Sequence, residues 1–178
     1  NFNKYTPGMV GGHCISVDPY YLTYKARKIG LVPSLIESGR KINNKMSSHI
    51  FREVLRIMKK KKIISNKLNI LIMGITYKEN LPDIRNSKIV DLIEHFKKIK
   101  CNISVYDPVA IKADVYKEFK IKLIKYPKKN NYDVVILSVA HNDFKKMGFS
   151  KIKSFGKEKN VIYDVKWLLS KSQSDGRL

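Results

Sequence analysis

Residues 68–74 read Leu-Asn-Ile-Leu-Ile-Met-Gly, and this stretch decides how the rest of the chain folds. A short apolar run is typical of a strand that is buried on both faces of a parallel sheet. The glycine that follows the run lets the chain turn tightly where the strand ends. We therefore predict that a parallel α/β sheet begins at this stretch.

Helical and strand-like segments alternate from this strand to the C-terminus. Further strands are expected at residues 102–107, 122–125, 132–139 and 160–164, and helices at residues 86–98 and 111–119. A segment through Phe144 and Met147, with a turn near Gly148, precedes the last strand. Such alternation predicts a Rossmann-like parallel sheet that is covered on both faces and binds ligands at the carboxyl ends of its strands.

A long amphipathic segment precedes the sheet at residues 33–58. Its apolar side chains recur mostly at steps of three and four, which indicates a helix that is long for a globular protein. Because the small domain that follows cannot cover the whole stripe, we expect a central dimerisation helix, with Ile50 in the contact between two copies. We accordingly divide the chain into a cysteine-loop and helical region, residues 1–64, and a Rossmann-like domain, residues 65–178.

Residues 6–19 read Thr-Pro-Gly-Met-Val-Gly-Gly-His-Cys-Ile-Ser-Val-Asp-Pro. Two adjacent glycines allow the backbone to approach a ligand closely, and the thiol of Cys14 follows them. Asp18 is expected to cap a short helix that runs to about Lys28, which would place Cys14 just before a positive helix end and favour a thiolate. A buried cysteine in an ordinary glycine-rich turn is the alternative interpretation.

The loop after the first predicted strand lacks the dinucleotide fingerprint Gly-x-Gly-x-x-Gly. Lys78 and Arg85 offer positive side chains instead, and Asn86 or Ser87 could cap the next helix and aim it at an anion. This pattern indicates a phosphate site. An ion pair between Asp83 and Arg85 in a solvated loop is the alternative.

The formal net charge is +21, and the lysines are spread over the whole chain. No nucleic-acid recognition motif accompanies the charge, so we expect an anionic small ligand and no nucleic acid, although a basic nucleic-acid-binding protein remains an alternative. The two cysteines show no metal-ligand spacing, so no metal site is expected. No apolar stretch is long enough to span a membrane, and we expect a soluble cytoplasmic protein without a membrane partner.

Two motifs carry a resemblance to a known family. Gly-Gly-His-Cys-Ile-x-Val-Asp-Pro-Tyr-Tyr-Leu, residues 11–22, and Gly-x-Thr-Tyr-Lys-Glu-Asn-x-Pro-Asp-x-Arg-Asn-Ser-Lys, residues 74–88, resemble signatures of the UDP-glucose/GDP-mannose dehydrogenase family. The resemblance covers a catalytic loop, a central helix and a UDP-binding domain in that order. It implies that the N-terminal NAD domain is absent from this chain, and that the isolated chain is inactive.

The resemblance also implies a reaction and residue roles. Such enzymes oxidise the C6 alcohol of a UDP-sugar to the uronic acid with NAD, through a thiohemiacetal and a thioester on a cysteine, for surface polysaccharide biosynthesis. By position, Cys14 resembles the nucleophile and Asp18 a carboxylate that assists the water or orients the site. Cofactor contacts are implied for Cys14 and Arg85. Substrate contacts are implied for Tyr5, Gly8, Val10, Gly11, Tyr77, Lys78 and Lys166.

The order Pro-Gly-Met-Val at residues 7–10 is similar to the family branch that acts on UDP-N-acetylhexosamines. Met9 and His13 would shape the pocket beside the sugar, and UDP-N-acetylglucosamine or UDP-N-acetylgalactosamine is the expected substrate. The partners implied are this UDP-sugar and a second copy of the chain. A non-catalytic nucleotide-sugar-binding module, with a structural cysteine, is the alternative function.

Overall fold

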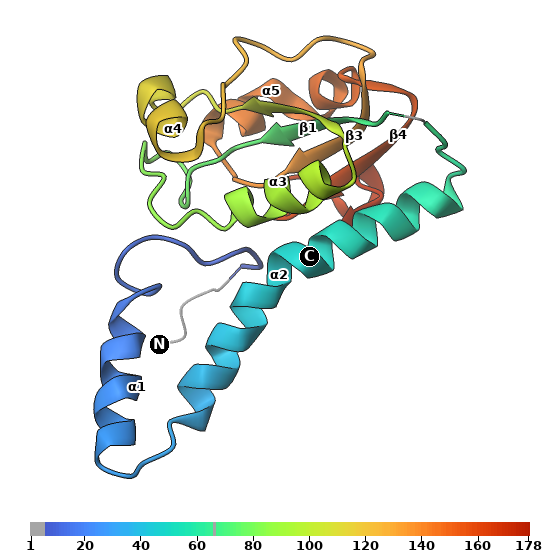
Figure 1. Ribbon diagram of the computed structural model, residues 1–178. Helices are drawn as coiled ribbons and strands as arrows, with labels where there is room; N and C mark the ends of the chain where they lie inside the picture. Colours follow the sequence, from blue (N-terminus) through green and yellow to red (C-terminus); the bar gives the residue numbers. More distant parts are fainter. Residues whose placement is uncertain (1–5, 66) are drawn as a thin grey trace.

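The structure is a computed structural model that describes residues 6–65 and 67–178. A helical hairpin projects from an α/β sheet domain (Figure 1). The hairpin consists of α1 (Asp18–Lys28) and α2 (Ser34–Lys60), and α2 runs on beneath the sheet domain. Both helices lie where the sequence predicts them.

The sheet has five parallel strands in the order β2-β1-β3-β4-β5. The strands are β1 (Asn69–Met73), β2 (Asn102–Tyr106), β3 (Tyr132–Leu137), β4 (Gly156–Asp164) and β5 (Gly176–Arg177). They are connected through α3 (Ile89–Lys98), α4 (Lys112–Phe119), α5 (Asn142–Lys153) and the short 3-10 helix η1 (Lys171–Gln173). This architecture confirms the predicted α/β class. Because β1 lies between β2 and β3, the order of the strands reverses at β1, and ligands of such sheets bind at this point.

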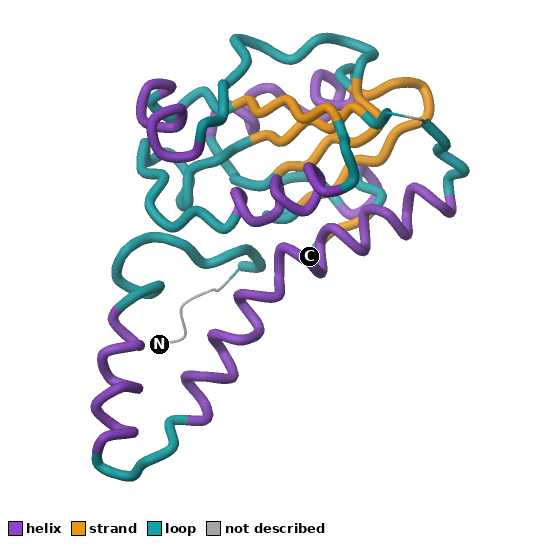
Figure 2. The backbone as a smooth tube through the Cα atoms, viewed as in Figure 1, coloured by secondary structure: helices purple, strands orange, loops and turns teal. Residues whose placement is uncertain are grey.

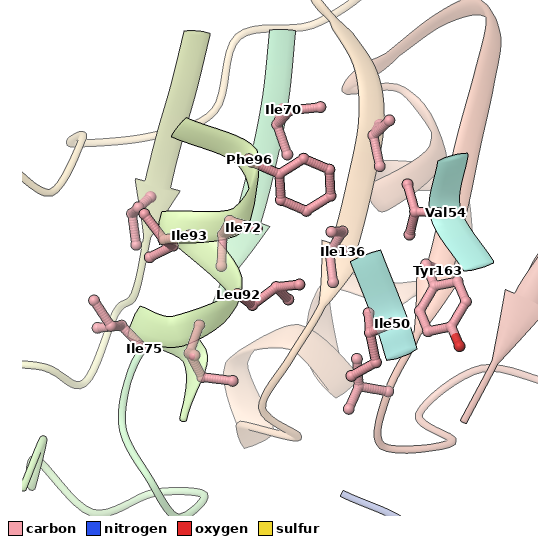
Figure 3. Close-up of a cluster of buried hydrophobic side chains, with 14 of the residues drawn as sticks. Ile50, Val54, Ile70, Ile72, Ile75, Leu92, Ile93, Phe96, Ile136 and Tyr163 are labelled. Atoms are coloured by element: carbon pink, nitrogen blue, oxygen red, sulfur yellow. The ribbon is translucent and has the colours of Figure 1, made fainter. Parts of the chain in front are cut away.

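Alternate side chains of β1 fill two separate cores. Ile70 and Ile72 face the cluster that includes side chains of α2 and α3, whereas Leu71 and Met73 face the cluster that includes Phe144. Figure 3 shows the first cluster between the sheet and these two helices. These four side chains are fully buried, which is why residues 70–73 are apolar without alternation.

The second half of α2 belongs to the chain's own core. Ile50 and Val54 are fully buried, and α2 contacts α3 and β4. The expectation that Ile50 lies between two copies is therefore wrong, because α2 crosses the sheet domain diagonally and fills its core from one side (Figure 2). The first half of α2 differs, since Leu35 is 86% exposed and Ile42 is 62% exposed.

Several predicted boundaries shift. The helix expected from Asn86 begins at Ile89, because Asn86 has a positive φ of 51°. The Ser87 hydroxyl donates to the Ile75 carbonyl and also accepts the Ile89 N–H at 3.4 Å, so it does contact the first N–H of this helix. The strand expected at residues 122–125 is reduced to one bridge, between Val105 and Leu123. The last predicted strand begins earlier than expected, at Gly156, and β5 was not predicted because it has only two residues.

Candidate functional site

The cysteine loop, residues 6–17, is held between α2 and the loop that follows β1. The Gly12 amide donates to the Arg85 carbonyl at 3.0 Å, and the Asn86 side chain donates to the Gly12 carbonyl at 3.0 Å. On the other side, the Asn43 amide group accepts from the Val10 N–H at 2.9 Å and donates to the Val10 carbonyl at 2.8 Å. The loop is thereby fixed at its backbone, which leaves its side chains free to line a cleft.

The two adjacent glycines bring this loop against Tyr77. A Cβ on Gly11 would lie 2.7 Å from the Asn86 carbonyl oxygen, and a Cβ on Gly12 would lie 2.8 Å from the Tyr77 ring. Gly12 also has a φ of +84°, which other residues rarely adopt. The close neighbour of the glycines is thus a second loop of the protein, whereas the sequence suggested a ligand.

One cleft of about 480 Å³ joins three distant segments of the chain. Its lining residues are Met9, Val10, Gly11, Gly12, His13, Cys14, Ile15, Tyr77, Lys78, Glu79 and Lys166. The Cys14 side chain is exposed there, and a Cβ on Gly8 would lie 2.9 Å from the Lys166 ammonium nitrogen. The structure therefore brings together most of the residues for which the sequence predicts a substrate or catalytic role.

A smaller hollow of about 20 Å³ continues from the cleft toward the sheet. Thr76 and Ser138, which follow β1 and β3, line it together with Lys88 at the start of α3 and Lys166. The Thr76 and Ser138 hydroxyls donate to backbone carbonyls, and the Lys88 ammonium pairs with Asp91 at 3.2 Å. Two lysines and a helix N-terminus still favour an anion at the point where the strand order reverses.

Arg85 does not line the cleft, although its backbone carbonyl holds the Gly12 N–H. Its guanidinium pairs with the Asp83 carboxylate and holds the pKa of Asp83 below its usual value. Arg85 lines a second hollow of about 390 Å³, beside Asp114 and Lys117 of α4. The ion pair that the sequence analysis kept as an alternative is therefore present.

Asp18 also lies outside the lining of the cleft. Val17, not Asp18, occupies the position before α1, and Asp18 is the first residue of the helix. The Asp18 N–H donates to the Cys14 carbonyl at 2.8 Å, so the carboxylate lies one helical turn from the cysteine. Tyr5, for which a substrate contact is predicted, lies outside the described residues.

The predicted site residues omit three residues that line the cleft. Gly12 is one, although its positive φ explains the Gly-Gly pair, and Ile15 and Glu79 are the others. Glu79 could have been identified from the motif Tyr77-Lys78-Glu79. When a loop at the end of a strand places a tyrosine and a lysine in a cleft, the next side chain can lie there too.

The described part of the chain holds two free cysteines, Cys14 and Cys101. Within residues 6–65 and 67–178, no group of three or more His, Cys, Asp or Glu side chains is placed to hold a metal ion. No helix of these residues is both long and apolar enough to cross a membrane.

Fold and cleft together define an α/β protein of the Rossmann-like class with a candidate ligand cleft at the reversal of strand order. Residues 71–171 match the UDP binding domain of the UDP-glucose/GDP-mannose dehydrogenase family, and residues 1–45 match the central domain of that family. The chain belongs to the UDP-glucose/GDP-mannose dehydrogenase family.

Among the relatives, the UDP-N-acetyl-D-glucosamine 6-dehydrogenase of Salmonella typhi is 43% identical over 178 residues, and that of Pseudomonas aeruginosa is 42% identical. The alignments cover all of this chain and 42% of each relative. A UDP-N-acetyl-mannosamine dehydrogenase structure from S. aureus superimposes with a TM-score of 0.68 at 27% identity, over 96% of this chain and 37% of the other. The chain thus spans about two fifths of the length of the curated relatives it matches.

Proposed function

We propose that this chain supplies the catalytic cysteine and the UDP-binding domain of an NAD-dependent UDP-sugar 6-dehydrogenase. The observation that carries the proposal is that Cys14 and the strand-end residues Tyr77 and Lys78 line one cleft. Membership in the family supports a nucleotide-sugar ligand for this cleft. The relatives named above support the reaction, the oxidation of C6 to a uronic acid.

Positive side chains account for binding of the diphosphate. Lys78 and Lys166 line the same cleft as the thiol. Lys88, whose ammonium pairs with Asp91 at 3.2 Å, adds a third positive side chain near the helix terminus. A diphosphate placed between these groups would hold the nucleotide at the sheet and leave the sugar to extend toward Cys14. Gly8, Val10 and Gly11 would contact the sugar or the phosphates with little side-chain bulk, and we propose a substrate contact for Tyr5 as well.

Cys14 has two tasks in the proposed reaction. Its thiolate adds to the C6 aldehyde, so that a carbon–sulfur bond forms and the carbonyl oxygen takes up a proton. After oxidation it holds the acyl group as a thioester until water cleaves the carbon–sulfur bond and releases the carboxylate and the thiol. We assign the orientation of the thiol or the water to Asp18, which lies one helical turn away.

NAD, when bound, supplies the hydride acceptor for both oxidations. This sequence contains no Gly-x-Gly-x-x-Gly fingerprint, so NAD would be bound mainly by residues outside it. Two groups of this chain fit a contact with it. Cys14 is exposed on the cleft, and the Arg85 guanidinium is 61% exposed and could exchange Asp83 for an anionic ligand.

We propose UDP-N-acetylglucosamine or UDP-N-acetylgalactosamine as the substrate. Met9 and His13, which were expected to shape the pocket beside the sugar, both line the cleft with Cys14. A flexible thioether adapts to the methyl group of an acetamide. The two bacterial relatives are UDP-N-acetyl-D-glucosamine 6-dehydrogenases, which agrees with this choice.

We further propose that the protein is a homodimer and that its product, a uronic acid, is used for polysaccharide synthesis. We place the boundary between the two regions of the chain at residues 64 and 65. The exposed apolar side chains of α1, of the first half of α2 and of the segment that joins these helices support an interface with a second copy. They are Tyr20, Tyr21, Leu22, Tyr24, Ile29, Leu31, Val32, Leu35 and Ile42.

Binding and turnover test the proposal separately. Calorimetry should show that the 178-residue chain binds UDP, while NADH production from a UDP-sugar and NAD should be undetectable. In an enzyme that joins this chain to a dinucleotide-binding domain, the ratio of kcat/KM values should favour a UDP-N-acetylhexosamine over UDP-glucose. NADH production by the purified chain, or a preference for UDP-glucose, would contradict the respective part.

A further inference from the structure

A buried histidine and aspartate lie beneath the loop that carries Tyr77, Lys78 and Glu79. His141 is fully buried at the end of β3, and Asp107 is 4% exposed at the end of β2. The His141 Nε2 atom lies 3.2 Å from the Asp107 Oδ2 atom. Neither residue lines the cleft, and the proposed chemistry leaves both unused.

Asp107 fixes the beginning of the loop. Its Oδ2 atom accepts the N–H of Ile75 at 2.6 Å and the N–H of Thr76 at 3.3 Å, while Oδ1 accepts the amides of Val109 and Ala110, each at 2.8 Å. Burial alone would disfavour the charged carboxylate. Hydrogen bonds from His141 and from these amides outweigh that effect and hold the pKa of Asp107 below its usual value.

His141 fixes the end of the loop. The Asn80 N–H donates to Nδ1 at 3.0 Å, so Nδ1 is an acceptor and the ring hydrogen lies on Nε2. Nε2 also lies 3.2 Å from the Thr76 hydroxyl, which itself donates to the Lys78 carbonyl at 2.9 Å. The Nε2 hydrogen is therefore shared between Asp107 and Thr76.

The two attachments enclose one tripeptide. Thr76 and Asn80 are both hydrogen-bonded to the buried pair of His141 and Asp107. The residues between them, 77–79, all line the cleft. Asn80 adopts a positive φ of 59°, and its side chain accepts the Asn142 N–H at 2.8 Å, which adds a further attachment at the same end.

We propose that His141 and Asp107 are positioning residues that hold residues 77–79 in the conformation that binds the UDP-sugar. This inference rests on the proposed function of the cleft. Without the pair, the loop would sample conformations in which Lys78 and Tyr77 face away from the ligand. A ligand that binds one loop conformation loses apparent affinity in proportion to the population of that conformation.

The test compares two His141 variants with a matched control. His141→Phe removes the hydrogen bonds of the ring with Asn80, Asp107 and Thr76 but keeps its edge-on contact with Phe144. His141→Asn keeps an acceptor near the position of Nδ1. The control is Asp133→Asn. Asp133 is also 4% exposed but lies at the opposite end of the strands, where it accepts the Asn69 N–H at 2.8 Å and pairs with Lys157.

UDP is the probe, and calorimetry on the full 178-residue chain measures its dissociation constant. Thermal unfolding and amide hydrogen exchange are measured on the same variants. We expect His141→Phe to weaken UDP binding about tenfold, because the loop would hold its binding conformation in about a tenth of the molecules. The same variant should exchange the amide hydrogens of Ile75 and Asn80 faster. His141→Asn should weaken binding less. Asp133→Asn should lower the melting temperature but leave UDP affinity and loop exchange as in the parent.

If His141→Phe does not fold, Thr76→Val removes the hydroxyl that links the ring to Lys78 and serves in its place. A folded variant with unchanged loop exchange, or with a loosened loop and unchanged UDP affinity, would overturn the inference. Equal loss of UDP affinity in Asp133→Asn would also overturn it. If the parent itself binds no UDP, the proposed function fails, and loop exchange in the variants still decides whether the pair holds the loop.

Discussion

At the scale of single residues, Cys14 carries the proposed chemistry. In an enzyme that contains this chain and a dinucleotide-binding domain, Cys14→Ser should abolish uronic acid formation, because a serine alkoxide does not readily replace a thiolate in forming and releasing the acyl intermediate. Binding of the UDP-sugar should persist. Chromatographic assay of the uronic acid product, with binding measured in parallel, checks both parts. Turnover like that of the parent would make Cys14 a structural residue.

Two glycines of similar φ offer a matched test of the loop contact. Gly12 has a φ of +84° and Gly30 a φ of +80°, but only Gly12 has neighbours within 4 Å of a Cβ. Gly12→Ala and Gly30→Ala should each lose about 1–2 kcal/mol of stability from backbone strain. Only Gly12→Ala should also displace the Tyr77 ring and weaken UDP binding.

Thermal unfolding and UDP calorimetry on both glycine variants provide the measurement. Equal UDP affinity in the two variants would show that the contact between Gly12 and Tyr77 does not shape the cleft.

The sequence motifs indicate several residues that line the cleft, but they do not show the contacts that depend on the folded geometry. Cys14, Tyr77 and Lys78 do meet in one cleft, as the motifs indicate. Arg85 does not line it, because an aspartate two residues earlier offers a nearer partner than any ligand. The role of His141 was not predicted, since a lone histidine after a strand shows no sign of the distant loop amide that it accepts.

At the scale of elements, α2 has two different halves. Leu35→Asp should leave the fold within about 0.5 kcal/mol of the parent but weaken dimerisation, because this side chain is 86% exposed on the proposed interface. The same change at Ile50 should unfold the chain, because it buries a charge without a partner in the core.

Sedimentation analysis and thermal unfolding of these two variants give the answer. A monomeric parent, or a Leu35→Asp variant with the dimer affinity of the parent, would contradict the proposed interface.

Periodicity explains why the elements were predicted better than their partners. Apolar steps of three and four locate α2 closely, and continuous apolar runs locate β1 and β3. The same stripe cannot say whether it faces the chain's own sheet or another molecule, so Ile50 was misplaced. Strand β5 has only two residues and depends on pairing with β4, which leaves no periodic signal.

At the scale of the whole molecule, a buried tyrosine links stability to alkaline pH. Burial raises the pKa of Tyr163 to about 12, so the folded chain holds this proton more tightly than the unfolded chain does. The resulting stabilisation is complete below the ordinary tyrosine value of 10.0 and is lost as the pH rises. The loss should reach roughly 2–3 kcal/mol by about pH 12.

Tyr163→Phe should remove this part of the alkaline dependence. Denaturant unfolding of parent and variant at a series of pH values isolates it as the difference between the two curves. Curves that stay parallel from pH 9 to 12 would show that Tyr163 ionises as easily in the folded state as in the unfolded state.

The central claim is that the thiol of Cys14 and the UDP-binding loop share one ligand cleft, and the alkylation rate of Cys14 tests it most directly. Mass spectrometry can follow iodoacetamide modification of Cys14 and Cys101 in the same sample. Cys101 is the internal control, because it is half-buried and burial raises the pKa of its thiol. We expect rapid modification of Cys14 that slows as UDP-N-acetylglucosamine saturates the chain, while the rate at Cys101 stays constant. Slow modification of Cys14, or a rate that does not change at saturating ligand, would contradict it.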